Sequence, residues 1–334
     1  MERGAWVHNV IFHQAAAWAM ARDAAPALKR GIRRLVVGSG SSYYLAQVVA
    51  EVAKRKGYQI AAAPSGDVVM EPDLCFTDVE EFIVVSRSGA SSEALWALDE
   101  AQRRNIRTVA VTCDPLSPLA QRADQAAVVP TGDDGTVVMI RSFTSMLVLL
   151  QQGLAGSLPR LELGVVDVLH QTDRWLAESP RPPHRVYLLG SGVRLGLVHE
   201  GALKIQEMAG TVAYSYSPLE FRHGPRGSVN ANDWVVLLGQ TTHARYEYGV
   251  LADLANQGPT MVVVAEPQWF ALIGDDGVVD RGILLPEDGA DDLKGPLAVI
   301  PLQLLAWHLA MAAGRNPDVP ENLTKVVAFE RESP

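Results

Sequence analysis

The stretch Arg34-Leu-Val-Val-Gly-Ser-Gly40 decides the fold class, and Val186-Tyr-Leu-Leu-Gly-Ser-Gly192 repeats its pattern about 150 residues later. In each copy a short apolar run ends in a Gly-Ser-Gly turn, and the first copy leads into a helical pattern over residues 43–55. Other apolar runs lie at residues 58–63, 82–85, 108–112, 126–129, 234–238 and 261–264. Other helical patterns lie at residues 92–103 and 141–154, around residue 200, and at 297–313. Short apolar strands that alternate with helices predict an α/β chain with parallel sheets sandwiched between helices.

The repeat predicts two domains, and a chain of 334 residues is long enough for two domains of about 100–200 residues. The proline-rich run Ser179-Pro-Arg-Pro-Pro183 marks the linker between them. We therefore expect an N-terminal helical arm over residues 1–30, a first domain over 31–175 and a second over 184–334.

Composition narrows the function classes. The chain is 48% hydrophobic, which is enough for sizeable cores, and its net charge of −9 argues against nucleic-acid binding. Its cysteines, Cys75 and Cys113, cannot form a disulfide framework, and no Cys/His spacing predicts a metal site. We find no secretory segment at the start and expect no apolar run of about 18 residues, so we expect a cytoplasmic protein without a membrane span, metal or cofactor.

The run Glu200-Gly-Ala-Leu-Lys-Ile-Gln-Glu207 places Glu200, Lys204 and Glu207 on one face of a helix. An exposed stripe of ion pairs would show the same spacing. A restricted turn follows at Arg222-His-Gly-Pro225, and it carries a group that titrates near neutral pH. A carboxylate and a histidine of this kind suit proton transfer between neighbouring carbons.

Two loops between a strand and a helix are candidate phosphate sites. Gly38-Ser-Gly-Ser-Ser42 offers a close backbone approach, helix N–H groups and the hydroxyls of Ser41 and Ser42. It lacks the third glycine of a dinucleotide-binding fingerprint. Ser86-Arg-Ser-Gly-Ala-Ser91 offers more donors, although a plain serine N-cap at Ser91 or Ser92 would look alike. Two such loops in one domain favour a sugar-phosphate site, in which Arg87 either binds the anion as a fork or points to solvent.

These motifs resemble those of the sugar isomerase (SIS) domain family. Within it the chain resembles the isomerase half of glucosamine-6-phosphate synthase and stand-alone phosphosugar isomerases of the AgaS and deglycase types. The segments at 301–308 and 322–325 add to the resemblance. It implies two tandem SIS domains, each flavodoxin-like, and a phosphosugar isomerase or amino-sugar-phosphate isomerase/deaminase acting by C1–C2 proton transfer. The alternatives are a fructosamine-6-phosphate deglycase and a non-catalytic sugar-phosphate sensor.

The resemblance also implies residue roles. Glu207 would be the base, and Glu200 and Lys204 would support it. The C-terminal segment of the second domain would reach the active site, where Lys325 would form a Schiff base. His223 would open the sugar ring from the neighbouring subunit of a homodimer. The phosphate would be bound by the loop serines, namely Ser41, Ser42, Ser86, Ser88 and Ser91, together with Arg87. Departures at Arg87, Ala90, Met139 and Glu321 leave the identity of the sugar open.

Overall fold

The structure is a computed structural model that describes residues 2–179, 181–274 and 276–329. The chain forms two compact units by its internal contacts. We call residues 13–158 and 321–334 the N-sheet unit, and residues 1–12 and 159–320 the C-sheet unit. Each unit contains one five-stranded sheet whose paired strands run parallel. The predicted α/β class is confirmed.

The N-sheet unit has the strand order β2-β1-β3-β4-β5. Its strands are β1 (Arg33–Gly38), β2 (Gln59–Pro64), β3 (Glu81–Val85), β4 (Arg107–Thr112) and β5 (Gln125–Val128). Its helices are α2 (Trp18–Asp23), α3 (Ser41–Arg55), α4 (Ser65–Met70), α5 (Pro72–Cys75), α6 (Ser92–Arg103), α7 (Pro118–Arg122) and α8 (Arg141–Ala155).

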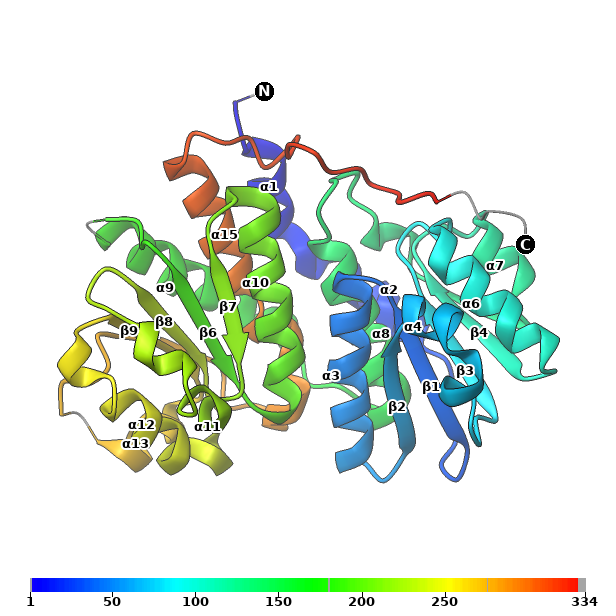
Figure 1. Cartoon of the computed structure of the whole chain (residues 1–334), viewed down its shortest axis with the longest axis horizontal. Coiled ribbons are helices and arrows are strands. Elements are labelled where there is room, and N and C mark those ends of the chain that lie inside the picture. The colour runs from blue at the N-terminus through cyan, green and yellow to red at the C-terminus, as the bar shows by residue number, and fades with distance from the viewer. Residues whose placement is uncertain (1, 180, 275, 330–334) are drawn as a thin grey trace. The chain divides into compact units, whose positions relative to one another are not determined.

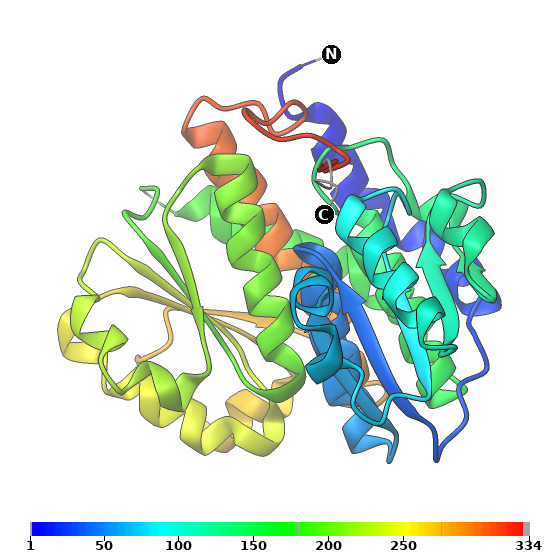
Figure 2. The ribbon, with the colours of Figure 1, turned by 45° about the vertical axis from the view of Figure 1, so that its right-hand side comes forward.

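Helices cover both faces of this sheet. Helices α4, α6 and α7 pack on one face, where Leu35, Val37, Phe82 and Val84 meet side chains such as Leu98. Helix α3 lies against β1 and β2 on the other face and packs on α8 (Figure 1, Figure 2). Strand β3 is buried along its whole length, which explains why its residues 82–85 form a continuous apolar run rather than an alternating one.

The C-sheet unit repeats the topology in the order β10-β9-β8-β6-β7. Its strands are β6 (Val186–Gly190), β7 (Ala213–Tyr216), β8 (Trp234–Leu238), β9 (Thr260–Ala265) and β10 (Arg281–Leu284). Its helices are α9 (Val165–Glu178), α10 (Leu195–Ala209), α11 (Pro218–Phe221), α12 (Ala244–Ala252), α13 (Pro267–Ile273), α14 (Gly295–Ala298) and α15 (Ile300–Ala312). Counted along the chain, both sheets have the flavodoxin-like order 2-1-3-4-5, which confirms the predicted fold of each repeat.

Two layers of helices enclose the C-sheet as well. Helices α11, α12 and α13 lie over the face that buries Tyr187, Leu237 and Trp269. Helices α10 and α15 pack together on the opposite face, with α9 against α15 (Figure 2). A Cβ at Gly201 would lie 2.4 Å from Leu302 Cδ1, so glycine permits the close approach of α10 to α15.

Each end of the chain belongs to the unit whose other residues are distant from it in the sequence. Helix α1 (Ala5–His13) begins in the C-sheet unit, where Trp307 Nε1 donates to the Gly4 carbonyl at 2.8 Å. Residues 321–329, drawn in red in Figure 1, belong to the N-sheet unit. The predicted ranges 1–30, 31–175 and 184–334 stay a prediction, and the compact units divide the chain at other positions.

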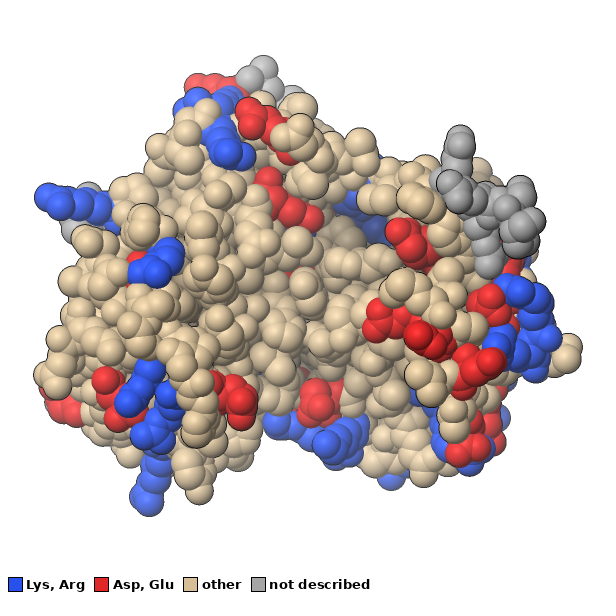
Figure 3. Space-filling view, in the orientation of Figure 1, with Lys and Arg blue, Asp and Glu red and all other residues tan. Residues whose placement is uncertain are grey.

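Gly295–Ala312 is apolar and long enough to cross a membrane, so the prediction that no run reaches that length was wrong. This stretch is 78% buried inside the protein, as the core helix of a globular unit would be. On the face drawn in Figure 3, acidic and basic side chains of the described residues are interspersed and no extended basic area is visible.

Candidate active site

The loop after β1 is shaped by two glycines. A Cβ at Gly38 would lie 2.5 Å from the Ser42 carbonyl carbon, and Gly40 has φ +55°, a conformation that favours glycine. Ser41 and Ser42 therefore open α3 directly after the strand and are 5% and 4% exposed. Met139 Sδ lies 3.8 Å from Ser42 Oγ. Met139, one of the departures that leave the identity of the sugar open, is thus in contact with one of the predicted anion ligands.

The loop after β3 turns back on itself through its own hydroxyls. Ser86 Oγ accepts a hydrogen bond from the Gly89 N–H at 3.2 Å, and Ser88 Oγ accepts one from the Ala90 N–H at 3.3 Å. Because these hydroxyls act as acceptors within the loop, their O–H groups can still donate to a bound anion. Ser91 occupies the N-cap position of α6 without a side-chain capping bond, so the plain N-cap interpretation does not account for its hydroxyl.

The two loops leave the sheet side by side. Strands β1 and β3 are parallel neighbours, with Val37 paired to Val84, so both loops lie at the same carboxyl edge. β2 lies on the far side of β1, which makes this the point where the strand order reverses. Ligands of open α/β sheets bind at such points. We call residues 38–42 and 86–91 the paired loops.

In the C-sheet unit, α10 buries the predicted stripe of charges. Lys204 Nζ is ion-paired with the Glu207 carboxylate and lies 3.5 Å from Glu200 Oε1. Glu200 and Lys204 are fully buried, whereas the side chain of Glu207 is 21% exposed. The alternative of an exposed ion-pair stripe is therefore wrong. Of the three members of this buried charge triad, only Glu207 has exposed side-chain surface.

The turn that carries His223 is fixed at its flanks. Arg222 Nε and Arg226 Nη1 each donate to Asp253 Oδ2 at 2.8 Å, and Gly224 between them has φ +129°. His223 itself is exposed. Within the described part of the C-sheet unit, no hydrogen bond or ion pair joins His223 to the charge triad. The turn thus presents the imidazole outward from its own unit.

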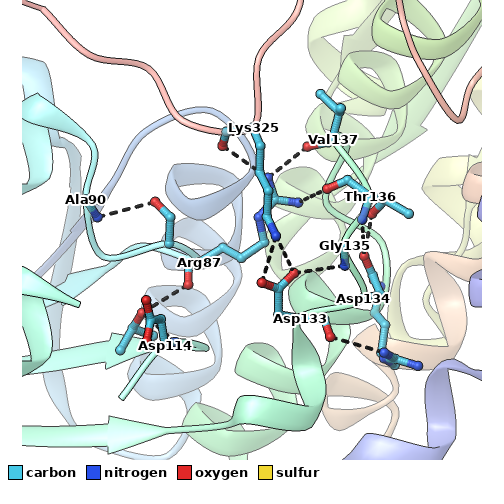
Figure 4. Close-up of polar contacts among 12 residues, drawn as sticks. Arg87, Ala90, Asp114, Asp133, Asp134, Gly135, Thr136, Val137 and Lys325 are labelled. Carbon is cyan, nitrogen blue, oxygen red and sulfur yellow. Dashed lines mark hydrogen bonds and ion pairs between the residues drawn. The ribbon is translucent and has the colours of Figure 1, made fainter. Parts of the chain in front are cut away.

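Neither expectation for Arg87 matches its geometry. The guanidinium is 6% exposed and turns into the N-sheet unit, where Nη1 donates to the carbonyls of Thr136 and Val138 at 2.9 and 3.3 Å. Nη2 donates to the carbonyls of Val137 and Lys325 at 2.8 and 3.2 Å. Four backbone oxygens thus occupy the fork that was expected to bind phosphate or to face solvent. Arg87 connects three chain segments instead (Figure 4).

Lys325 lies in the N-sheet unit together with the paired loops. Its Nζ is 2.9 and 2.8 Å from the two carboxylate oxygens of Asp133. Asp133 was missed by sequence reasoning because Asp-Asp-Gly reads as a turn. No short-range signal links it to a lysine 192 residues away.

Among the described residues, no group of three or more His, Cys, Asp or Glu side chains is arranged to hold a metal ion.

The comparisons with known proteins agree with the two-repeat fold described above. The model of the SIS domain matches residues 28–155 and 181–313. The chain belongs to the SIS domain family. AgaS of Streptomyces coelicolor, a proposed D-galactosamine-6-phosphate deaminase, is 30% identical in an alignment of 321 positions that covers 88% of this chain and 83% of the relative.

Two further proteins are similar to this chain over most of its length. The isomerizing glutamine–fructose-6-phosphate aminotransferase of Aeropyrum pernix is 29% identical in an alignment of 325 positions that covers 89% of this chain but only 51% of that enzyme. The crystal structure of the glucosamine-6-phosphate deaminase of Thermotoga maritima superposes with a TM-score of 0.79 at 26% identity, and the match covers 97% of this chain and 100% of that one. By their names, these relatives act on sugar phosphates, two as deaminases and one as an isomerizing aminotransferase.

Proposed function

We propose that this SIS protein is a phosphosugar isomerase or amino-sugar-phosphate isomerase/deaminase that transfers a proton between C1 and C2 of an open-chain sugar. The observation that carries the proposal is the buried charge triad of α10. Glu207 is its one partly exposed member, and Lys204 fixes the direction of its carboxylate. A carboxylate held in this way is suited to act as a general base.

The proposal assigns proton transfer to the C-sheet unit. Glu207 takes a proton from one carbon, which leaves an enediol or, for an amino sugar, an enolamine, and returns it to the neighbouring carbon. Glu200 and Lys204 position Glu207 rather than exchange the proton, because both are fully buried. A positioned general base contributes about 10²- to 10⁴-fold to the rate of such a step.

Anion binding is assigned to the N-sheet unit. The proposed phosphate ligands are the hydroxyls of Ser42, Ser86, Ser88 and Ser91, with the first-turn N–H groups of the twelve-residue helix α6 other than that of Ser92, which donates to the Val327 carbonyl. Ser41 lies in the same first turn of α3. Arg87 is left out of this set because its terminal nitrogens donate to backbone carbonyls.

His223 is assigned to ring opening in the active site of a partner subunit. Its exposure and its braced turn support this role, and a homodimer is therefore part of the proposal. Lys325 is assigned to an imine with a ketose phosphate. The proposal also includes a cytoplasmic location, and a substrate that is a sugar phosphate and not a nucleic acid.

A substrate panel tests the reaction type. The protein is mixed separately with fructose-6-phosphate, tagatose-6-phosphate, glucosamine-6-phosphate, galactosamine-6-phosphate and a fructosamine-6-phosphate. Sugar interconversion without ammonia supports the isomerase, and ammonia release from an amino sugar supports the deaminase. Amino-acid release indicates the deglycase. If a sugar phosphate raises the melting temperature and no substrate is turned over, the protein is a sensor and the proposal is wrong.

A further inference from the structure

The C-terminal segment, residues 321–329, runs back onto the second of the paired loops. The Ser92 N–H donates to the Val327 carbonyl at 3.3 Å. Ser92 Oγ accepts from the Phe329 N–H at 2.8 Å and lies 3.1 Å from the Phe329 carbonyl. The Phe329 ring meets Trp96 edge-on, with the ring centroids 6.1 Å apart. The segment is therefore attached to the first turns of α6, directly after the loop of residues 86–91, which we call the anion loop.

Lys325 is held through its backbone carbonyl and through its side chain. Its carbonyl accepts from Arg87 Nη2, and its Nζ is bound by both carboxylate oxygens of Asp133 (Figure 4). Burial alone would raise the pKa of Asp133. The hydrogen bond from Lys325, the Gly135 N–H and the charges of Lys325 and Arg87 outweigh burial, so the pKa lies below its usual range and the carboxyl is ionised at neutral pH.

Arg87 joins the segment that carries Asp133 to the anion loop. Three of its four carbonyl partners belong to residues 136–138, just after Asp133. Its own carbonyl accepts from the Cys113 N–H and from Thr112 Oγ1, both at 3.0 Å, which fixes its backbone beyond the end of β4. Because Arg87 directly follows Ser86, the anion loop, the loop at 133–138 and the C-terminal segment form one hydrogen-bonded assembly.

We propose that Asp133 is a positioning residue that acts with Arg87 to hold the C-terminal segment, and with it the Lys325 amine, against the anion loop. Asp133 acts through Lys325. The part of this inference that concerns turnover rests on the proposed function, whereas the part that concerns attachment of the segment does not.

Trypsin cleavage after Lys325 reports this attachment in the full-length protein. The Asp133→Asn variant leaves the sequence around the cleavage site unchanged and removes the charge that binds Nζ. Since the Lys325 side chain is 34% exposed, the pair is only partly shielded from water. We expect Asp133→Asn to raise the initial rate of cleavage after Lys325 by about two- to tenfold, measured as loss of residues 326–334 by mass spectrometry.

The controls come from the same unit. Asp114→Asn removes an equal charge from an exposed aspartate, whose Oδ1 accepts from the Leu116 N–H, and should leave the cleavage rate unchanged. Cleavage after the exposed Arg30 reports opening of the unit as a whole and should not change in either variant. Asp133→Glu should restore most of the protection at Lys325. Equal cleavage after Lys325 in wild type and Asp133→Asn, or an equal rise after Arg30, overturns the inference.

Turnover separates this inference from the proposed function. If the wild type is active, Asp133→Asn should lower kcat about tenfold with KM within about twofold, because the serines that hold the anion are intact. Asp133→Glu should recover most of kcat. An unchanged kcat in Asp133→Asn contradicts the positioning role even if the enzyme assignment holds. If the wild type is inactive on every substrate but Asp133→Asn still raises cleavage after Lys325, the proposed function is wrong. The inference that Asp133 holds the C-terminal segment then stands.

Discussion

Replacing Lys204 by methionine tests the buried charge triad of α10. Lys204 lies between Glu200, whose Oε1 is 3.5 Å from Nζ, and Glu207, and its own side chain has no exposed surface. Methionine has nearly the same length and no charge, so it removes the cation without leaving a large cavity. The fully buried Glu200 then loses the ammonium of Lys204.

The expected loss follows from this burial. Removing one partner of a buried ion pair costs about 3–5 kcal/mol, because the remaining charge stays in a poorly solvated place. For a unit of this size, each kcal/mol shifts the melting temperature by roughly 2–4 °C. Lys204→Met should therefore lower the melting temperature by about 6–20 °C.

Differential scanning calorimetry and urea unfolding followed by circular dichroism measure the effect. The double variant Glu200→Gln with Lys204→Met removes both fully buried charges and should regain at least about 2 kcal/mol. Arg245→Met removes an exposed cation from the same unit and should change stability by less than about 0.5 kcal/mol. If Lys204→Met unfolds within about 1 kcal/mol of wild type, the reasoning about the triad is refuted.

Two further predictions concern one residue each. Gly89 has φ +59° and a Cβ there would lie 2.3 Å from Ser117 Oγ, so Gly89→Ala should cost about 2 kcal/mol more than Gly31→Ala, where φ is +80° but nothing lies within 4 Å. Equal melting temperatures for these two variants would contradict the clash. Burial raises the pKa of Glu247 from 4.5 to about 7, against hydrogen bonds from Gln240, Trp269 and Ser191. The folded state thus holds more protons than the unfolded state between these values, and stability falls by about 3 kcal/mol as pH rises from 4.5 to 7. Urea unfolding between pH 5 and 8 should show a flatter profile for Glu247→Gln, and an unchanged slope would argue against a buried neutral carboxyl.

The fold could be predicted from the sequence where local patterns and burial agree. Strands β3 and β8 are buried along their whole length, so β8 and residues 82–85 of β3 appear as uninterrupted apolar runs. The edge strands β7, Ala-Tyr-Ser-Tyr, and β10, Arg-Gly-Ile-Leu, are short and partly exposed. They form strands because they pair with β6 and β9, and a segment of four residues is too short to show that pairing as a hydrophobic pattern in the sequence.

The candidate site likewise contains residues that a local pattern predicts and residues whose roles depend on distant contacts. The charge triad could be found because its members follow the helical period within eight residues. The direction of Arg87 could not, since its carbonyl partners lie about 50 residues away and, for Lys325, 238 residues away. Asp133 was overlooked for the same reason, as its role appears only when the C-terminal segment lies beside it.

The most direct test of the proposed chemistry is proton NMR in D₂O with the sugar phosphate that the substrate panel identifies. The wild type should place deuterium at C1 or C2 of the product. Glu207→Gln should lose at least about 10²-fold of this exchange while the substrate still raises its melting temperature. Glu287→Gln, which alters an exposed carboxylate of the same unit, should exchange at the wild-type rate. Exchange in Glu207→Gln at the wild-type rate would contradict the assignment of Glu207 as the base.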